Sequence, residues 1–433
     1  MDIVYPRMRK QTNSLQIRTL VLDSGERLPL LIDRATGVPL HEPTLYTVTR
    51  LRTKNLASAT IYQHCIAIMV LTLFLQDGEI DLNERMASGR LLTLPEIESL
   101  VRYCRLRMDE VVGLSEQSRP DRSSSKVISL ERLRMRRGRK ALPKELASES
   151  AATRRMYIGA YLQWLVDLRA TDTILSPHPA LATASAIAIG ALREHLPPKH
   201  RQAKTVRKGF AKATRDRILL LVVPRSEENP WSGSHCQYRN ELVVRWLLHL
   251  GVRRGEILGI QTSDIDFQRN EVLVARRADD VDDPRRDEPN TKTFSRVLPL
   301  SDEMAALSRH YILKVRNQLK GARKHKYLLV ADGTGAPLGK AAFAKIFSEL
   351  RAKFPKGASI HPHLFRHTWN DDFSEQMDRE NIPEDRERKL RSMLMGWSPT
   401  SDTAETYTKR HIEKKAKQAS LDMQNKSMKD KKK

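Results

Sequence analysis

The chain has 433 residues, of which 76 are lysine or arginine and 52 are aspartate or glutamate, so its formal net charge is +24. A hydrophobic fraction of 40% and a charged fraction of 30% are typical of a folded globular protein and exclude a disordered or fibrous chain. At roughly 100–200 residues per domain, the length allows two to four domains. The positive charge exceeds what solubility requires and favours a polyanionic partner, nucleic acid ahead of an anionic membrane.

The cysteines and the apolar segments narrow the class of protein further. Cys65, Cys104 and Cys236 form neither a closely spaced even set nor a Cys-x-x-Cys pair. This argues against a disulfide scaffold and against a cysteine-based zinc site. The first ten residues lack the apolar region of a signal peptide, and the longest apolar run, residues 66–75, is shorter than the roughly 18 residues of a membrane span. We therefore expect a cytoplasmic protein with no membrane partner, in which residues 66–75 belong to a buried helix.

The first half of the chain is predicted to be helical after an N-terminal arm. Residues 1–45 alternate short apolar pairs with turn residues, which is typical of strands or irregular structure. Helices are expected at residues 58–76 with Ser58 as cap and Asp77-Gly78 as stop, at 94–108 after a capping box at 93–96, at 152–169, and at 180–195. Residues 119–144 carry ten Lys or Arg against two acidic residues, and we interpret them as a basic linker or surface loop.

A second basic segment, residues 199–212, marks the expected domain boundary. Beyond it, helices are expected at residues 239–250, 252–260, 302–318, 340–353, 363–377, 383–395 and 404–417, with strands at 271–275, 295–300 and 327–331. The sequence therefore predicts an arm of unknown role (1–45), a helical domain (46–200), a mostly helical domain with a small β-sheet (205–417) and a lysine-rich disordered tail (418–433).

Four segments of the second half carry side chains that suit one reaction. The first is residues 251–256, where Arg253 stands at the mouth of a helix. The others are residues 291–293 around Lys292, residues 361–368, and residues 394–397, ten residues before Tyr407.

These residue types suit an attack on a phosphodiester. Two guanidiniums can clamp the non-bridging oxygens and stabilise a pentacoordinate transition state. His363 and Arg366 are three residues apart on one expected helix, so both can face the same phosphate. A tyrosine hydroxyl can attack phosphorus, and a lysine can protonate the departing 5′ oxygen. Such a reaction needs no metal, because side chains supply the cations.

The order and spacing of these segments resemble the tyrosine recombinase (phage integrase) family. The family's Gly-Leu-Arg-x-Ser/Gly-Glu block is similar to residues 251–256, and its hairpin lysine before an Arg-x-Val-Pro-Leu-like strand is similar to Lys292 before residues 296–300. Its His-x-Leu-Arg-His-Thr block is matched by residues 363–368. Its Leu-Gly-His block and nucleophilic tyrosine are matched by residues 394–397 and Tyr407. The resemblance covers residues 205–415 and extends only loosely to the N-terminal helices.

The resemblance implies a role for each site residue. Tyr407 would attack the scissile phosphate, giving a 3′-phosphotyrosyl intermediate and a free 5′-OH. Arg253 and Arg366 would stabilise the transition state. His363 would help to move the tyrosine proton, and Lys292 would protonate the leaving oxygen. No cofactor is implied.

Three features depart from the family pattern. Trp397 stands where most members have histidine, although some members use tryptophan and retain packing or hydrogen bonding at the nucleophile. Tyr407 lies one residue further along than is common. The acidic residues of segment 278–290 lengthen the loop before Lys292 and are unexpected near a phosphate, which leaves a surface lysine as the alternative for that position.

Neighbouring residues have structural alternatives. Arg254 could be confused with Arg253, but the Gly-x-Arg-x-Gly-Glu register favours Arg253. Glu256 is expected to brace the turn rather than to act in catalysis. His363 and His367 share a helical face, yet no glutamate of a zincin pattern lies between them and no cysteine is near, so we expect no metal site there.

We expect a mostly α multidomain fold with a helical core DNA-binding domain and an α+β catalytic domain of tyrosine recombinase type containing a small antiparallel sheet. The expected function is site-specific recombination of double-stranded DNA, without a small-molecule substrate. By resemblance, a tetramer would assemble on DNA in a bacterial cytoplasm, associated with the nucleoid, as in mobile genetic elements. The alternatives are a type IB topoisomerase-like nicking and closing enzyme and a non-catalytic DNA-binding protein of the same fold. An RNA-binding protein has only the charge in its favour.

Overall fold

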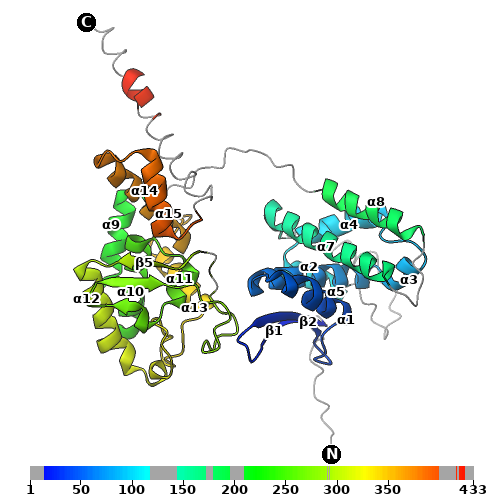
Figure 1. Ribbon diagram of the computed structural model, residues 1–433, viewed down its shortest axis with the longest axis horizontal. Helices are drawn as coiled ribbons and strands as arrows, with labels where there is room; N and C mark the ends of the chain where they lie inside the picture. The colour runs from blue at the N-terminus through cyan, green and yellow to red at the C-terminus, as the bar shows by residue number, and fades with distance from the viewer. Residues whose placement is uncertain are drawn as a thin grey trace, which may run out of the picture. The chain divides into compact units, whose positions relative to one another are not determined.

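Figure 1 shows the computed structural model, which describes residues 14–117, 144–171, 179–195, 209–289, 291, 293–398, 416 and 419–424. The chain divides into two compact units. One contains Met1–Val21 and Arg27–Gln202, and the other contains Leu22–Glu26 and Ala203–Lys433. Each unit has a hydrophobic core of its own.

The first unit begins with a β-hairpin. Strand β1 (Leu15–Val21) pairs antiparallel with β2 (Arg27–Asp33) in a register that runs from Leu15 opposite Asp33 to Val21 opposite Arg27. Six of the seven β2 residues are buried, and β2 packs against helix α2 (Ser58–Asp77). A strand buried on both faces needs apolar side chains at consecutive positions, which the run Leu30-Leu31-Ile32 supplies. The hairpin is therefore built into the core of this unit.

Helix α2 is the centre of the first unit. It ends at Asp77 with Gly78 as its C-cap, as predicted, but the N-cap is Ala57 and the predicted cap by Ser58 is wrong. Among the helices that the structure describes, α2 has the length and composition that could cross a membrane. It packs against β2, α4 (Leu94–Arg105) and α7 (Ser148–Ala170), so the prediction of a buried core helix at residues 66–75 is confirmed.

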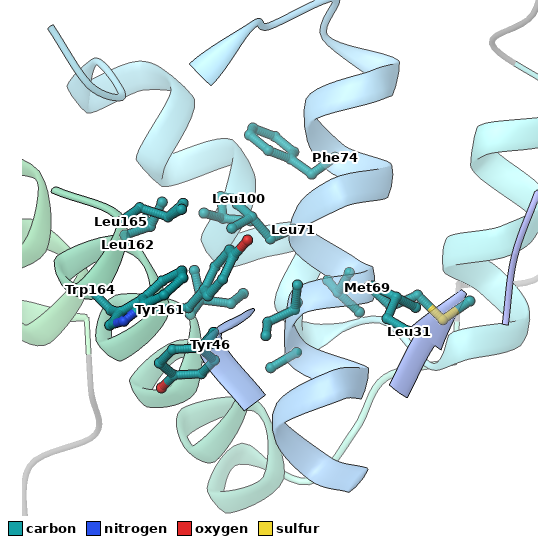
Figure 2. Close-up of a cluster of buried hydrophobic side chains, with 14 of the residues drawn as sticks. Leu31, Tyr46, Met69, Leu71, Phe74, Leu100, Tyr161, Leu162, Trp164 and Leu165 are labelled. Atoms are coloured by element: carbon teal, nitrogen blue, oxygen red, sulfur yellow. The ribbon is translucent and has the colours of Figure 1, made fainter. Parts of the chain in front are cut away.

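Figure 2 shows the core around α2. The ring of Tyr46 lies 5.2 Å from that of Tyr161 in an edge-to-face arrangement and 5.2 Å from that of Trp164, while Leu71 and Leu100 flank the cluster. The other α-helices that the structure describes in this unit are α1 (His41–Tyr46), α3 (Leu82–Ala87), α5 (Met108–Gln117) and α8 (Leu181–Glu194).

The predicted helix 94–108 is two helices. The Thr93 backbone N–H donates to Glu96 Oε2 (2.7 Å), as the capping box predicts. Helix α4 ends at Arg105 because Leu106 is extended and forms a bridge with Glu145; α5 then begins at Met108. The basic segment 119–144 lies outside the described residues except for Lys144.

The second unit combines helices with one three-stranded sheet. Its helices are α9 (Lys212–Leu221), α10 (Ser234–Leu250), α11 (Arg254–Gly259), α12 (Asp302–His310), α13 (Lys340–Ala352), α14 (Pro362–Arg379) and α15 (Glu384–Met395). A π-helix (Tyr311–Val315) and a 3-10 helix (Arg316–Gln318) continue α12 to the predicted end. Strands β3 (Ile265–Asp266), β4 (Glu271–Val274) and β5 (Arg296–Pro299) form an antiparallel sheet in that order. The predicted fold class, mostly helical with a small antiparallel sheet, is confirmed.

The strand predicted at residues 327–331 is wrong. The segment is buried, but its backbone is divided between separate partners. Leu328 N–H donates to Ile260 O (2.8 Å), and Leu338 N–H donates to Leu329 O (2.9 Å). These contacts make isolated bridges instead of a ladder. The third strand of the sheet is β3, whose two residues are too few to give a sequence pattern.

The C-terminal predictions are only partly covered by the structure. Tyr407 and the rest of the helix expected at 404–417 lie outside the described residues, apart from Ala416, which is helical. In the tail predicted to be disordered, residues 419–424 are helical. The disordered tail at 418–433 stays a prediction.

Candidate active site

A glycine turn places the first predicted site residue. Helix α10 ends at Gly251, whose φ of +61° is left-handed. A Cβ there would lie 2.9 Å from the Trp369 ring, so a side chain at this position would clash as well as strain the backbone. Two residues later, Arg253 is the N-cap of α11, and its backbone N–H donates to Glu256 Oε2 (2.7 Å). The Arg253 side chain is about one-third exposed, at 34%.

Helix α14 places the second arginine. The Arg366 side chain is 1% exposed, and its Nη1 donates to Gly251 O (2.6 Å) while its Nη2 donates to Met395 O (3.2 Å). Its guanidinium carbon lies 5.2 Å from the centre of the Trp397 ring. Arg366 therefore connects α14, the Gly251 turn and the end of α15.

A pocket joins three of the predicted residues. It has a volume of about 350 Å³ and is lined by Val252, Arg253, Arg254, Gly255, His361, Pro362, His363 and Arg366. His363 is exposed, and its ring packs edge-to-face on His367 at 4.4 Å. The arrangement offers two guanidiniums and an imidazole to one anion, and fixed guanidiniums of this kind suit a phosphate.

Glu256 was predicted from the sequence only to brace the turn. In the structure its buried carboxylate also holds the arginines of the site. Its side chain is fully buried, and Arg296 donates to it through Nη1 (3.1 Å) and Nη2 (3.0 Å). The Thr293 hydroxyl donates to Oε1 (2.5 Å), and Arg366 Nη1 lies 4.0 Å from Oε2. Burial raises the pKa of Glu256, but the hydrogen bonds and charge of Arg296, and then the charge of Arg366, lower it to about 2. A carboxylate that is ionised at neutral pH therefore holds the guanidiniums in place.

Arg296 connects the start of β5 to the end of α15. Its Nε donates to Leu394 O (2.5 Å), and the Phe294 N–H donates to Gly396 O (3.0 Å). Gly396 has φ +63°, and a Cβ there would lie 2.8 Å from Phe294 O. Sequence reasoning missed this role, although the arginine that opens the strand motif was the signal that could have indicated it.

The structure describes one of the three remaining predicted residues. Trp397 is 7% exposed and packs with Met395 beneath Arg366. Lys292 and Tyr407 lie outside the described residues. Thr291 and Thr293, on either side of Lys292, are both buried, and Thr293 is anchored on Glu256.

The acidic segment before Lys292 has a structural use. Asp283 forms a buried ion pair with Arg285 (2.8 Å), whose Nη1 also donates to Leu258 O (3.0 Å) and Leu338 O (3.1 Å). The other contacts are from the Asp279 N–H to Glu288, from the Tyr327 hydroxyl to Asp280 (2.7 Å), and between Lys340 and Asp287. These carboxylates are engaged with cations and donors of the same unit, which answers the objection that acidic residues are unexpected in this loop.

Comparisons with known proteins find one family match, within the second unit, and several solved structures that cover more of the chain. A sequence model of the phage integrase family matches residues 227–414, and a comparison with curated proteins finds no match. Among solved structures, XerH site-specific recombinase bound to difH substrate is 12% identical, with a TM-score of 0.44 over 74% of this chain and 82% of that one. The Tn1549 transposon integrase with circular intermediate DNA is 16% identical, with a TM-score of 0.37 over 73% and 95%. XerA recombinase is 14% identical, with a TM-score of 0.35 over 87% and 97%. Scores this low add no weight to the family match.

Proposed function

We propose that the chain is a member of the phage integrase family, the tyrosine recombinases, whose sequence model matches residues 227–414, and that it cleaves and rejoins specific sites in duplex DNA. The observation that carries the proposal is the convergence of Arg253, His363 and Arg366 on one pocket above a buried, ionised Glu256. Such a pocket is preorganised for the charge that develops on a phosphate under attack.

The reaction follows from the roles of the residues. The Tyr407 oxygen forms a bond to phosphorus, and its proton passes toward His363. The bond from phosphorus to the 5′ oxygen breaks, and Lys292 protonates that oxygen. Arg253 and Arg366 hold the non-bridging oxygens throughout. The phosphotyrosyl bond conserves the energy of the phosphodiester, so a 5′-OH from a partner strand can reverse the attack without ATP.

The charge of the chain supports DNA as the partner. A net charge of +24 produces a sequence-independent attraction to phosphates that weakens as salt rises. The helical first unit would act as the core DNA-binding domain, with residues 119–144 contacting phosphates. Four protomers on DNA, exchanging one pair of strands at a time in a bacterial cytoplasm, are the assembly and setting that we propose with it.

Trapping of the covalent intermediate tests the proposal. The wild type, incubated metal-free with a nicked suicide duplex from the DNA flanking the gene, should give a denaturation-resistant adduct, because the short product strand diffuses away before religation. Tyr407→Phe should give none, since it lacks the attacking oxygen. Tight binding by both proteins without any adduct would overturn the recombinase and leave a non-catalytic binder. Relaxation of supercoiled DNA without strand transfer between two sites would indicate a topoisomerase.

Replacement of each of the two adjacent arginines of the pocket should have a very different effect on the rate of adduct formation. We expect Arg253→Ala to slow adduct formation by at least about 100-fold, because it removes a donor that faces the phosphate. Arg254→Ala should change the rate little, because that side chain is exposed at the rim. Single-turnover rates on one duplex at fixed salt measure both. The reverse order of effects would move the assignment to Arg254.

A further inference from the structure

A second cluster of ligand-type side chains lies away from the pocket, at the start of α10. His235 and Cys236 are the second and third residues of that helix, and Asp332 follows the buried segment 327–331. One ligand atom from each residue lies within 4.8 Å of the others, and His235 Nδ1 is 3.1 Å from Asp332 Oδ1. His235 and Cys236 lie far from Asp332 in the sequence, yet the three residues bring a nitrogen, a sulfur and an oxygen close together.

The imidazole of this cluster lacks hydrogen bonds. The His235 side chain is only 12% exposed, and within the described part of the chain neither of its ring nitrogens makes a hydrogen bond. Nδ1 approaches the carboxylate without hydrogen-bond geometry. A buried polar atom without a partner has lost its hydrogen bonds to water and gained none in return, so such atoms are rare unless another group satisfies them. The His235 nitrogen and the Asp332 carboxylate both offer electron pairs to the same point. They satisfy each other poorly, but both can bind a cation placed between them.

We propose that His235, Cys236 and Asp332 bind one zinc ion. Thiolate and imidazole together select zinc over magnesium or calcium, which prefer oxygen ligands alone. In a tetrahedral site with Zn–N and Zn–O bonds of about 2.0 Å, nitrogen and oxygen ligands stand about 3.3 Å apart, close to the observed 3.1 Å. The Asp332 side chain is 57% exposed, so water can complete the fourth position.

Arg239 supports the sulfur ligand. Its Nη2 donates to Cys236 Sγ at 3.8 Å, while Nη1 is held by Val330 O (3.0 Å) and Nε by Asn240 Oδ1 (2.9 Å). Burial raises the pKa of the Cys236 thiol, and the Arg239 guanidinium opposes that shift by stabilising the thiolate, the form that binds zinc. Binding replaces the Cys236 thiol proton with the metal and releases that proton to solvent.

The zinc would stabilise the fold and would take no part in the reaction at the phosphate. Helix α10 has 17 residues and, at 1.5 Å per residue, is about 25 Å long. The cluster lies at its start, whereas the turn that positions Arg253 lies at its end. Zinc would fix the start of α10 to the turn that contains Asp332. The inference therefore stands independently of the proposed function.

Cobalt substitution tests the site in the full-length protein. The chain is reduced, stripped with chelator, and titrated with Co²⁺, which gives a thiolate charge-transfer band and visible bands of tetrahedral geometry when a cysteine binds it. We expect both bands at one cobalt per chain, with zinc displacing the cobalt. Cys236→Ser should abolish the charge-transfer band, and Asp332→Asn should weaken zinc binding at least about tenfold. The matched control Asp287→Asn, another exposed carboxylate of the same unit, should leave binding unchanged.

The thermal stability of the wild type provides a second test, which does not depend on whether a variant folds. Zinc at 100 times its Kd should raise the Tm of the second unit by about 5–10 °C, and chelator should reverse the shift. The proposal is overturned if the reduced wild type gives no thiolate band with cobalt, or if the band persists in Cys236→Ser.

Discussion

Replacement of Glu256 by glutamine should lower the free energy of unfolding of the second unit by about 3–5 kcal/mol at neutral pH. The substitution preserves size but removes the only negative charge described beside two buried guanidiniums. Arg296 would lose its two-pronged ion pair, and Arg366 would lose the carboxylate 4.0 Å away. A glutamine amide would also point an N–H₂ group at guanidinium donors. Urea unfolding followed by tryptophan fluorescence measures the effect.

Glu228→Gln is the matched control. Glu228 also receives two guanidinium hydrogen bonds, from Arg217, each 2.8 Å long. Its side chain is 61% exposed, so water screens the pair and solvates the arginine once the charge is gone. We expect a far smaller loss of stability than for Glu256→Gln. Equal losses would mean that burial of the Glu256 network contributes nothing.

The stabilities of the wild type and of Glu256→Gln should respond differently to acid. The folded pKa of Glu256, about 2, is below its ordinary value of 4.5, so the ionised carboxylate stabilises the fold at every pH above 4.5. That contribution decreases as the pH falls from 4.5 toward 2, because the unfolded state then binds a proton at Glu256 that the folded state does not yet bind. The stability gap between wild type and Glu256→Gln should be constant above pH 4.5 and narrow below it. A gap independent of pH down to 2 would contradict the assigned pKa.

The part of the site that the sequence predicts is the part encoded locally. The spacing of His363 and Arg366 on one helix, and the glycine that ends α10 before Arg253, depend on backbone rules that operate within a few residues. Motif order then predicts that these segments meet. The helices were predictable for the same reason, because their apolar periodicity and caps are local.

The rest depends on contacts between distant segments. Glu256 and Arg296 are 40 positions apart, and only the fold makes their ion pair the support of the pocket. Residues 327–331 have the composition of a strand, yet backbone bonds to Ile260 and Leu338 give them no ladder. His235 and Cys236 contain no metal-binding spacing of their own, because the third ligand comes from Asp332. Side chains of this kind are found only after tertiary structure is known.

Replacement of Arg366 by lysine should slow adduct formation by about 10³-fold while DNA binding changes little. Lysine keeps the charge, so a purely electrostatic role would tolerate it. Arg366, however, is held by Gly251 O and Met395 O at once, which fixes the plane of its guanidinium before a phosphate arrives. A lysine ammonium cannot satisfy both carbonyls and also present two parallel N–H groups to phosphate oxygens. Loss of one such donor in a preorganised site costs about 10²–10³-fold in rate, and loss of the fixed orientation adds to it.

Arg316→Lys separates this effect from damage to the fold. Arg316 is equally a buried arginine that donates to backbone carbonyls, those of Ala322, His325 and Tyr327, but it does not line the pocket. Both variants should unfold at lower urea than wild type, because each leaves carbonyls without donors. At a urea concentration where all three proteins are folded, only Arg366→Lys should lose cleavage. A comparable loss of cleavage in Arg316→Lys would attribute the effect to packing. A wild-type rate of cleavage in Arg366→Lys would mean that Arg366 takes no part in the chemistry. The reason is that a flexible side chain with the correct charge can fill every role except that of a preorganised clamp.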